Sequence, residues 1–153
     1  MYYPDLFPYP NKDKAPVSGY LTLSVGWLVA NQPYIRGEVP VGFVDRLWIF
    51  CCNAVLYTLG YHGCPFCRGS PFGVVAQHGQ EKRRLGSAEI RVLGMNNIIY
   101  AAPDLIYHYV VNHHYRPPSK FIQSVLEGPL PGSSEYKLIL DVLKLTYPEW
   151  ARD

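Results

Sequence analysis

Four stretches of the chain carry hydrophobic residues at three- and four-residue intervals, the spacing that predicts amphipathic helices. In the first, Phe43, Leu47 and Phe50 follow Pro40, and proline is well tolerated in the first turn of a helix. The other three begin at residues typical of helix starts, a proline–aspartate pair in one case and serine in two. The expected helices span residues 40–53, 103–116, 119–127 and 133–145.

Shorter stretches favour strands. Leu21, Leu23 and Val25 alternate with smaller or polar residues, which is the period of a half-buried strand. Two further β-prone runs, residues 89–93 and 98–101, flank "GMNN", whose glycine and asparagines tolerate the positive φ of a hairpin turn. Strands and helices together predict an α+β fold: a small antiparallel sheet with about four helices.

The chain is expected to form one domain. Its 153 residues are enough to bury a sizeable core, and no internal repeat of about 20 to 50 residues divides residues 1–153. Residues 1–16 are dense in proline and tyrosine and predict an extended arm that lies on the domain through its aromatic rings. Residues 68–88 combine glycine, serine and glutamine with "EKRR", a composition that predicts a mobile loop.

Composition and charge narrow the class of protein. Hydrophobic residues make up 48% of the chain and charged residues 17%, which indicates a folded domain. The formal net charge of +2 predicts no strong attraction to nucleic acid or to an anionic membrane. Because no apolar run approaches the roughly 18 residues of a membrane span and the N-terminus lacks a signal-peptide pattern, a soluble, cytoplasmic protein without a membrane partner is expected. Its cysteines should then be reduced, with Cys51 and Cys52 in core packing.

The chemistry of the chain centres on a CxxC motif. Cys64 and Cys67 stand in "YHGCPFCRG", and such a tight turn lets two thiolates reach one zinc ion. The expected helix after Pro103 carries His108 and His113, which can supply the other two ligands of a tetrahedral site. Knuckle, hairpin and helix follow each other as in treble-clef zinc modules, and the ligand types are those of a finger-like site. We therefore predict a structural Zn²⁺ held by these two cysteines and two histidines.

Two features leave other ligand sets open. Residues 65–107 separate the first cysteine from the first histidine, far more than the about 12 to 15 residues of a usual finger, although a long loop adds little closure entropy. His108 and His113 lie about 140° apart on an ideal helix, so joint ligation needs an altered last turn. The alternatives are the other imidazole and carboxyl groups near the motif: His114, Asp104, His62 and His78.

Interpretations that involve no metal also fit these cysteines and histidines. A CxxC pair can be redox-active, but that chemistry favours a helix directly after the motif, and "RGSP" indicates a loop. The thiols can also be inert, and His113 alone can be a hydrogen-bonded core histidine. Only the combination with the cysteine pair favours the metal site.

Several segments resemble a known pattern. "GEVPVGFVDRLW", "YHGCPFC", "AEIRV" and "YAAPDLIYHYVVNHHYRPPSKF" are similar to a family of small uncharacterised bacterial proteins with a CxxC pair, an EIRV strand and a YAAPxLIxHYV helix. The resemblance spans about residues 20–127 and implies no activity. Relative to that pattern the basic segment at residues 77–86 is extended.

The motifs favour a non-enzymatic role. The chain has no HExxH, GxSxG, Walker A or GxGxxG motif, and a site closed by four protein ligands is typical of structural zinc. We expect a zinc-stabilised protein-interaction module that binds another protein, because tyrosine and tryptophan are enriched at recognition surfaces. The alternatives are a zinc-finger-like nucleic-acid binder that uses Lys82, Arg83 and Arg84, and a metal-dependent hydrolase or nuclease.

Overall fold

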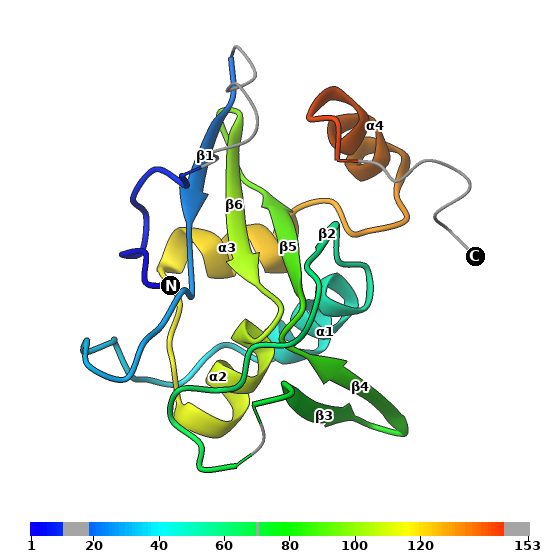
Figure 1. Ribbon diagram of the computed structural model, residues 1–153. Coiled ribbons are helices and arrows are strands. Elements are labelled where there is room, and N and C mark those ends of the chain that lie inside the picture. The colour runs from blue at the N-terminus through cyan, green and yellow to red at the C-terminus, as the bar shows by residue number, and fades with distance from the viewer. Residues whose placement is uncertain (11–18, 70, 146–153) are drawn as a thin grey trace.

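The computed structural model describes residues 1–10, 19–69 and 71–145 of the chain. Within these residues the chain forms four helices and six strands (Figure 1). The helices are α1 (Phe43–Cys52), α2 (Ile106–His113), α3 (Ser119–Glu127) and α4 (Ser134–Val142). The strands are β1 (Leu21–Ser24), β2 (Leu56–Tyr57), β3 (Val74–His78), β4 (Glu81–Leu85), β5 (Ala88–Leu93) and β6 (Ile98–Pro103). The predicted α+β class and the four helices are confirmed.

Four strands form the main sheet, in the order β1-β6-β5-β2 (Figure 1). β5 and β6 form the predicted hairpin, with Val92 opposite Tyr100 and a turn in which Asn96 and Asn97 have positive φ. β1 runs parallel to β6, so the sheet is mixed rather than purely antiparallel. A parallel pair needs a long crossover connection, and the chain between β1 and β6 contains α1 and the other four strands.

The segment 68–88, predicted to be a mobile loop, instead contains the β3–β4 hairpin, so that interpretation is corrected. The two strands pair antiparallel from Val74 opposite Leu85 to His78 opposite Glu81. The inward side of the hairpin is apolar, since Ala76 and Leu85 are buried. The run of charged residues on β4 hides this alternation in the sequence, because side chains on both faces of the strand are polar.

Helix α1 presents its predicted apolar stripe to the core. Its buried side chains are Phe43, Leu47, Trp48, Phe50 and Cys51. The predicted core position of Cys51 is confirmed, with 1% of the residue exposed. Arg46 is not part of this buried stripe. It donates a hydrogen bond to the carbonyl of Gly128, at 2.9 Å. Gly128 follows the last residue of α3, and a cation is favourable at the C-terminal end of a helix.

The N-terminal segment packs along the edge of the sheet. Residues 1–10 lie beside β1 and the residues after it, joined by isolated bridges. The rings of Tyr3 and Tyr9 lie 5.3 and 6.0 Å from the ring of Trp27, centroid to centroid. Residues 11–16 of the predicted arm lie outside the described residues.

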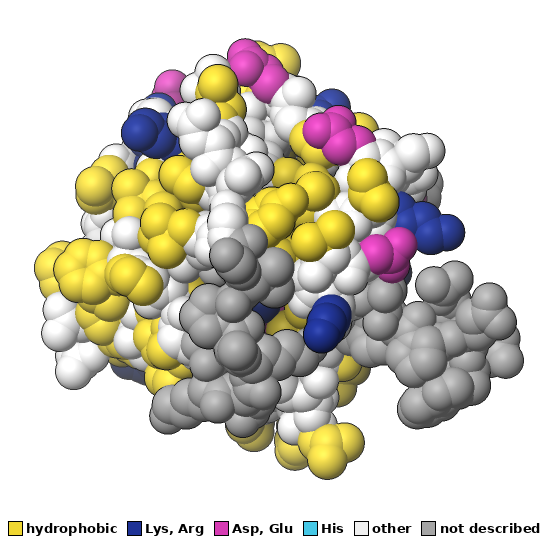
Figure 2. All heavy atoms as spheres, turned by 90° about the horizontal axis from the view of Figure 1, so that it is seen from above, with side chains coloured by type: hydrophobic (Ala, Val, Ile, Leu, Met, Phe, Trp, Pro, Cys, Tyr) yellow, Lys and Arg dark blue, Asp and Glu magenta, His cyan; other side chains and the backbone are white. Residues whose placement is uncertain are grey.

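Surface charge is mixed. Seen from above, Lys and Arg side chains are interspersed with Asp and Glu among apolar side chains (Figure 2). That face therefore carries no field of a single sign, in line with the formal net charge of +2. Across the described ranges, no helix has both the length and the apolar character needed to cross a bilayer.

Candidate metal centre

The CxxC motif forms a tight turn in the connection from β2 to β3. The backbone N–H of Cys67 donates to the carbonyl of Cys64 at 3.4 Å, and the N–H of Phe66 donates to the Cys64 sulfur, also at 3.4 Å. The second bond favours negative charge on that sulfur. The entrance to the turn is fixed by the backbone N–H of His62, which donates to the carbonyl of Gly86 at 2.8 Å.

Helix α2 supplies two imidazoles through an altered last turn. His108 lies in the first turn of the helix and His113 is its last residue. The backbone N–H of His114 donates to the carbonyl of Tyr109, five residues earlier instead of four, and His114 itself is left-handed with a φ of 56°. The widened turn places both imidazoles on one side of the helix, with their Nε2 atoms 3.2 Å apart.

The four predicted ligands converge. The Sγ atom of Cys67 lies 3.3 Å from Nε2 of both His108 and His113, and the Sγ atom of Cys64 lies 3.3 Å from Nε2 of His113. All four donor atoms lie within 4.8 Å of one another. Tetrahedral zinc would place its donors about 3.3 Å apart for two nitrogens and about 3.6 Å apart for sulfur and nitrogen. The three sulfur–nitrogen separations of 3.3 Å and the nitrogen–nitrogen separation of 3.2 Å are close to these values.

Burial controls the protonation of these ligands. It raises the pKa of the Cys64 thiol to about 11, while the N–H of Phe66 acts in the opposite direction. Burial lowers the pKa of His108, assisted by the neighbouring His113, and lowers the pKa of His113, assisted by Arg36. Neutral imidazoles offer lone pairs to a metal, and a bound ion would displace the thiol protons. Two thiolates and two neutral imidazoles would then balance the charge of a divalent cation.

Aromatic rings surround the donor cluster. The ring of Phe66, which stands between the two cysteines, lies 5.3 Å from the ring of His113 and 5.2 Å from that of Tyr34. Tyr34 also donates its hydroxyl to the carbonyl of His113 at 2.9 Å. The ring of Tyr109 completes the contact with Phe66 at 5.9 Å. These rings limit the access of water to one side of the cluster and fix the orientation of His113.

The other metal-ligand candidates lie elsewhere. Among the described residues, the cluster of four donors includes neither His114, which is exposed, nor Asp104, which is buried at the start of α2. His62 is exposed on the segment that leads into the knuckle. His78 is engaged elsewhere, since its Nε2 atom lies 3.1 Å from Oδ1 of Asp45.

The three basic residues proposed for nucleic-acid contact alternate along β4. Lys82 and Arg84 share one face of the strand, and Arg83 lies on the other. Arg83 is close enough to the Cys52 thiol to affect its pKa, and Arg84 donates to the carbonyl of Phe72 at 2.7 Å. The three positive charges therefore do not form one cluster on one face.

Sequence reasoning did not identify three residues around the cluster. Asn112 hydrogen-bonds to the side chain of His108, and such outer contacts orient metal-binding imidazoles. Its position four residues after His108 on the same helix is a local signal that could have identified it. Phe66 could have been noticed inside the CxxC motif. Tyr34 has no such signal, because it is remote in the sequence from both halves of the site.

Comparisons with known proteins give a family and no function. No curated protein and no solved structure matches the chain. The sequence model described as "Domain of unknown function (DUF7919)" matches residues 1–126. The match includes the N-terminal arm, the knuckle and α2, and it stops short of α4. The chain therefore belongs to the DUF7919 family of domains of unknown function.

Proposed function

We propose that Cys64, Cys67, His108 and His113 hold one structural Zn²⁺ and that the domain is a non-enzymatic protein-interaction module. The observation that carries the proposal is the convergence of four protein donors within 4.8 Å of one another. Four protein ligands fill the tetrahedral coordination of zinc, whereas catalytic zinc keeps a position open for water or substrate. This closed donor set favours a structural ion over a hydrolase or nuclease.

A zinc ion here would stabilise a part of the chain that has little regular structure. Among the described residues, isolated backbone hydrogen bonds, such as the bond from Thr58 to Ser87 at 2.7 Å, and side-chain contacts, such as that of Phe66 with Tyr109, hold the connection from β2 to β3. The ion would fasten this connection to α2, which packs on α1. Because ligands assemble only in the folded chain, the free energy of metal binding becomes free energy of folding.

An exposed apolar surface lies next to the knuckle and supports the interaction role. We call it the hairpin patch, and it consists of Tyr61, Phe72, Val75 and Arg84. The first three are 42%, 67% and 58% exposed. The four residues are neighbours, since the guanidinium of Arg84 lies 5.6 Å from the ring of Tyr61 and Arg84 pairs with Val75 across the hairpin. Exposed apolar groups gathered beside one cation are typical of a protein-binding surface.

Nucleic-acid binding is less well supported. Such a role relies on several cations directed at successive phosphates. The basic residues of β4 point to opposite faces of the strand, and Arg84 lies over Tyr61. We therefore place a partner protein, and not a nucleic acid, on the hairpin patch.

The metal proposal is tested by elemental analysis and by unfolding. Purified protein should contain about one zinc per chain, and Cys64→Ala or His108→Ala should lose the ion and lower the free energy of unfolding by at least about 4 kcal/mol. His114→Ala is the matched control, because His114 is adjacent to the cluster but is not one of its four donors. Unchanged melting of both variants, together with no effect of a chelator on the wild type, would reject the structural ion.

The interaction proposal is tested by comparing variants of the full chain as bait. Wild-type bait should capture one or more proteins from the source organism. The captured amount of each should fall at least tenfold for a Tyr61→Ser, Phe72→Ser double variant, as expected when apolar anchors are removed. Leu138→Ser is the control, since Leu138 is 62% exposed on α4, away from the hairpin patch. Capture of the same proteins by the double variant in the same amounts would contradict the assignment, provided that both variants melt like the wild type.

A further inference from the structure

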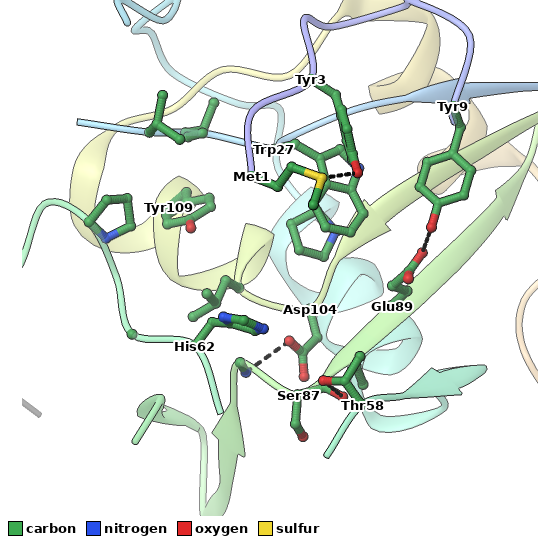
Figure 3. A pocket seen from close by; sticks show the side chains of 18 residues that line it. Met1, Tyr3, Tyr9, Trp27, Thr58, His62, Ser87, Glu89, Asp104 and Tyr109 are labelled. Atoms are coloured by element: carbon green, nitrogen blue, oxygen red, sulfur yellow. Dashed lines mark hydrogen bonds between the residues drawn. The ribbon is translucent and has the colours of Figure 1, made fainter. Parts of the chain in front are cut away.

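A cavity of about 380 Å³ lies beside the candidate metal centre (Figure 3). The N-terminal arm forms one wall through Tyr3 and Tyr9, and Trp27 adds a third aromatic ring. Gly63 and Pro65, the residues on either side of Cys64, also line the cavity. Its volume lies at the small end of the range for sites that bind small molecules or single side chains.

A buried carboxyl group faces this cavity. Asp104 and His62 are among its lining residues (Figure 3), and only 3% of Asp104 is exposed. The backbone N–H of Gly86 donates to Oδ1 of Asp104 at 2.9 Å. No lysine or arginine of the described residues forms a salt bridge with Asp104. Burial raises the pKa of this carboxyl to about 6, while the backbone N–H groups of Gly86, Ala88 and Leu105 and the charge of Arg83 act in the opposite direction.

The second carboxyl group of the cavity is already compensated. Oε1 of Glu89 accepts a hydrogen bond from the Tyr9 hydroxyl at 2.7 Å and pairs with Arg91 at 3.0 Å. Arg91 is not among the residues that line the cavity, and no lysine or arginine is. The cavity therefore offers a buried acid without a salt bridge and no lysine or arginine side chain, which disfavours phosphates and carboxylates as ligands.

The aromatic wall adds a complementary feature. The rings of Tyr3, Tyr9 and Trp27 lie within 5.3 to 6.0 Å of one another, and all three line the cavity. The indole N–H of Trp27 donates to the carbonyl of Ala101 at 3.0 Å, so this ring is held in place. The face of an aromatic ring attracts a cation and also packs against an apolar stem.

We propose that this cavity binds an organic cation, an ammonium group on an apolar stem, with the ammonium at the Asp104 carboxylate and the stem against Trp27. The ammonium supplies the salt-bridge partner that Asp104 lacks among the described residues, and it is the ligand class for which both walls are suited. None of the four metal donors lines the cavity, although Gly63 and Pro65 next to Cys64 do. Its ligand is either a free amine or the lysine side chain of a protein.

A purely architectural role for Asp104 makes a different prediction. In that case the carboxyl serves only to accept the backbone N–H groups of Gly86, Ala88 and Leu105. The side-chain oxygen of asparagine still accepts such bonds, so a purely architectural role predicts no effect of Asp104→Asn on amine binding. Loss of amine binding with retained folding in this variant therefore separates a ligand site from a structural acceptor.

The experiment is an NMR titration of the zinc-loaded, full-length protein with three matched probes: phenethylammonium chloride, phenethyl alcohol and sodium phenylacetate. The reporters are the backbone N–H of Gly86 and the indole N–H of Trp27. Phenethylammonium should shift both signals and saturate, with at least tenfold higher affinity than the alcohol, and phenylacetate should shift neither. Asp104→Asn should weaken ammonium binding at least tenfold. Asp141→Asn, the same change on the exposed side of α4, should leave it unaltered.

Equal affinity for ammonium and alcohol would overturn the proposal, as would wild-type ammonium binding by Asp104→Asn. So would the absence of any shift at tens of millimolar amine, a result that needs no variant to interpret. Nα-acetyl-lysine N-methylamide distinguishes the two sources of the cation. Binding tighter than that of phenethylammonium assigns the cavity to a lysine side chain, and weaker binding assigns it to a free amine.

Discussion

At the scale of single residues, Gly86 marks a place where two backbone segments approach each other closely. A Cβ at Gly86 would lie 2.3 Å from the carbonyl oxygen of His62 and 3.1 Å from Cα of Gly73, and the φ of Gly86 is 121°. Gly86→Ala must therefore both strain the residue and separate two backbone segments. We expect it to lower the free energy of unfolding by more than about 2 kcal/mol, measured by chemical denaturation.

Gly79, at the tip of the same hairpin, is the matched control for Gly86. It also has a positive φ, 59°, but no atom lies within 4 Å of a Cβ placed there. Gly79→Ala should therefore cost about 1 kcal/mol, the strain of a left-handed residue alone. Similar losses for the two substitutions would show that the close approach to His62 adds nothing to the cost of Gly86→Ala.

The candidate ligands could be identified from the sequence because each half of the site is local. A CxxC turn can be recognised from four consecutive residues. Two histidines can be assigned to one predicted helix from the hydrophobic period of that segment. The choice of His113 over His114 could not be derived, because it depends on the widened turn after Tyr109. An ideal helix leaves His108 and His113 about 140° apart. That the four donors hold a metal remains a prediction.

At the scale of elements, periodicity identified the helices and the central hairpin but not the way strands pair. A hydrophobic period is a property of one segment, whereas pairing depends on segments far apart in the chain. The parallel contact of β1 with β6 joins residues 21–24 to residues 98–101 and has no signature in either segment. The β3–β4 hairpin was missed because Lys82, Arg83 and Arg84 make both faces of β4 appear polar.

The cavity, too, could not be predicted from the sequence, because it is formed by segments far apart in the chain. Its walls come from the N-terminal arm, from Trp27, from the approach to the knuckle and from the ends of β5 and β6. In the sequence these segments are separate, and none of them contains a ligand-binding motif. Asp104 appears there as a residue at a helix start and as an alternative metal ligand, and its burial without a salt bridge is visible only in three dimensions.

At the scale of the whole molecule, three distant segments are fastened to the C-terminal end of α2. The knuckle meets it at His113, and Tyr34 donates to the carbonyl of the same residue at 2.9 Å. The N-terminal arm reaches the next turn, because the hydroxyl of Tyr115 donates to Asp5 at 2.7 Å. Asp5 also accepts the backbone N–H of Gly26 at 2.9 Å. Asp5 thus holds the arm that carries the aromatic wall of the cavity.

This arrangement predicts that Asp5 affects both stability and ligand binding. Asp5→Ala leaves the hydroxyl of the fully buried Tyr115 without its acceptor, so we expect a loss of about 2 kcal/mol in the free energy of unfolding. The same variant should bind phenethylammonium more weakly, because Tyr3 and Tyr9 are no longer held against Trp27. Asp5→Asn keeps an acceptor for Gly26 and should lose less of both. If Asp5→Ala is destabilised and yet binds the amine as tightly as the wild type, the arm is not a wall of the binding site.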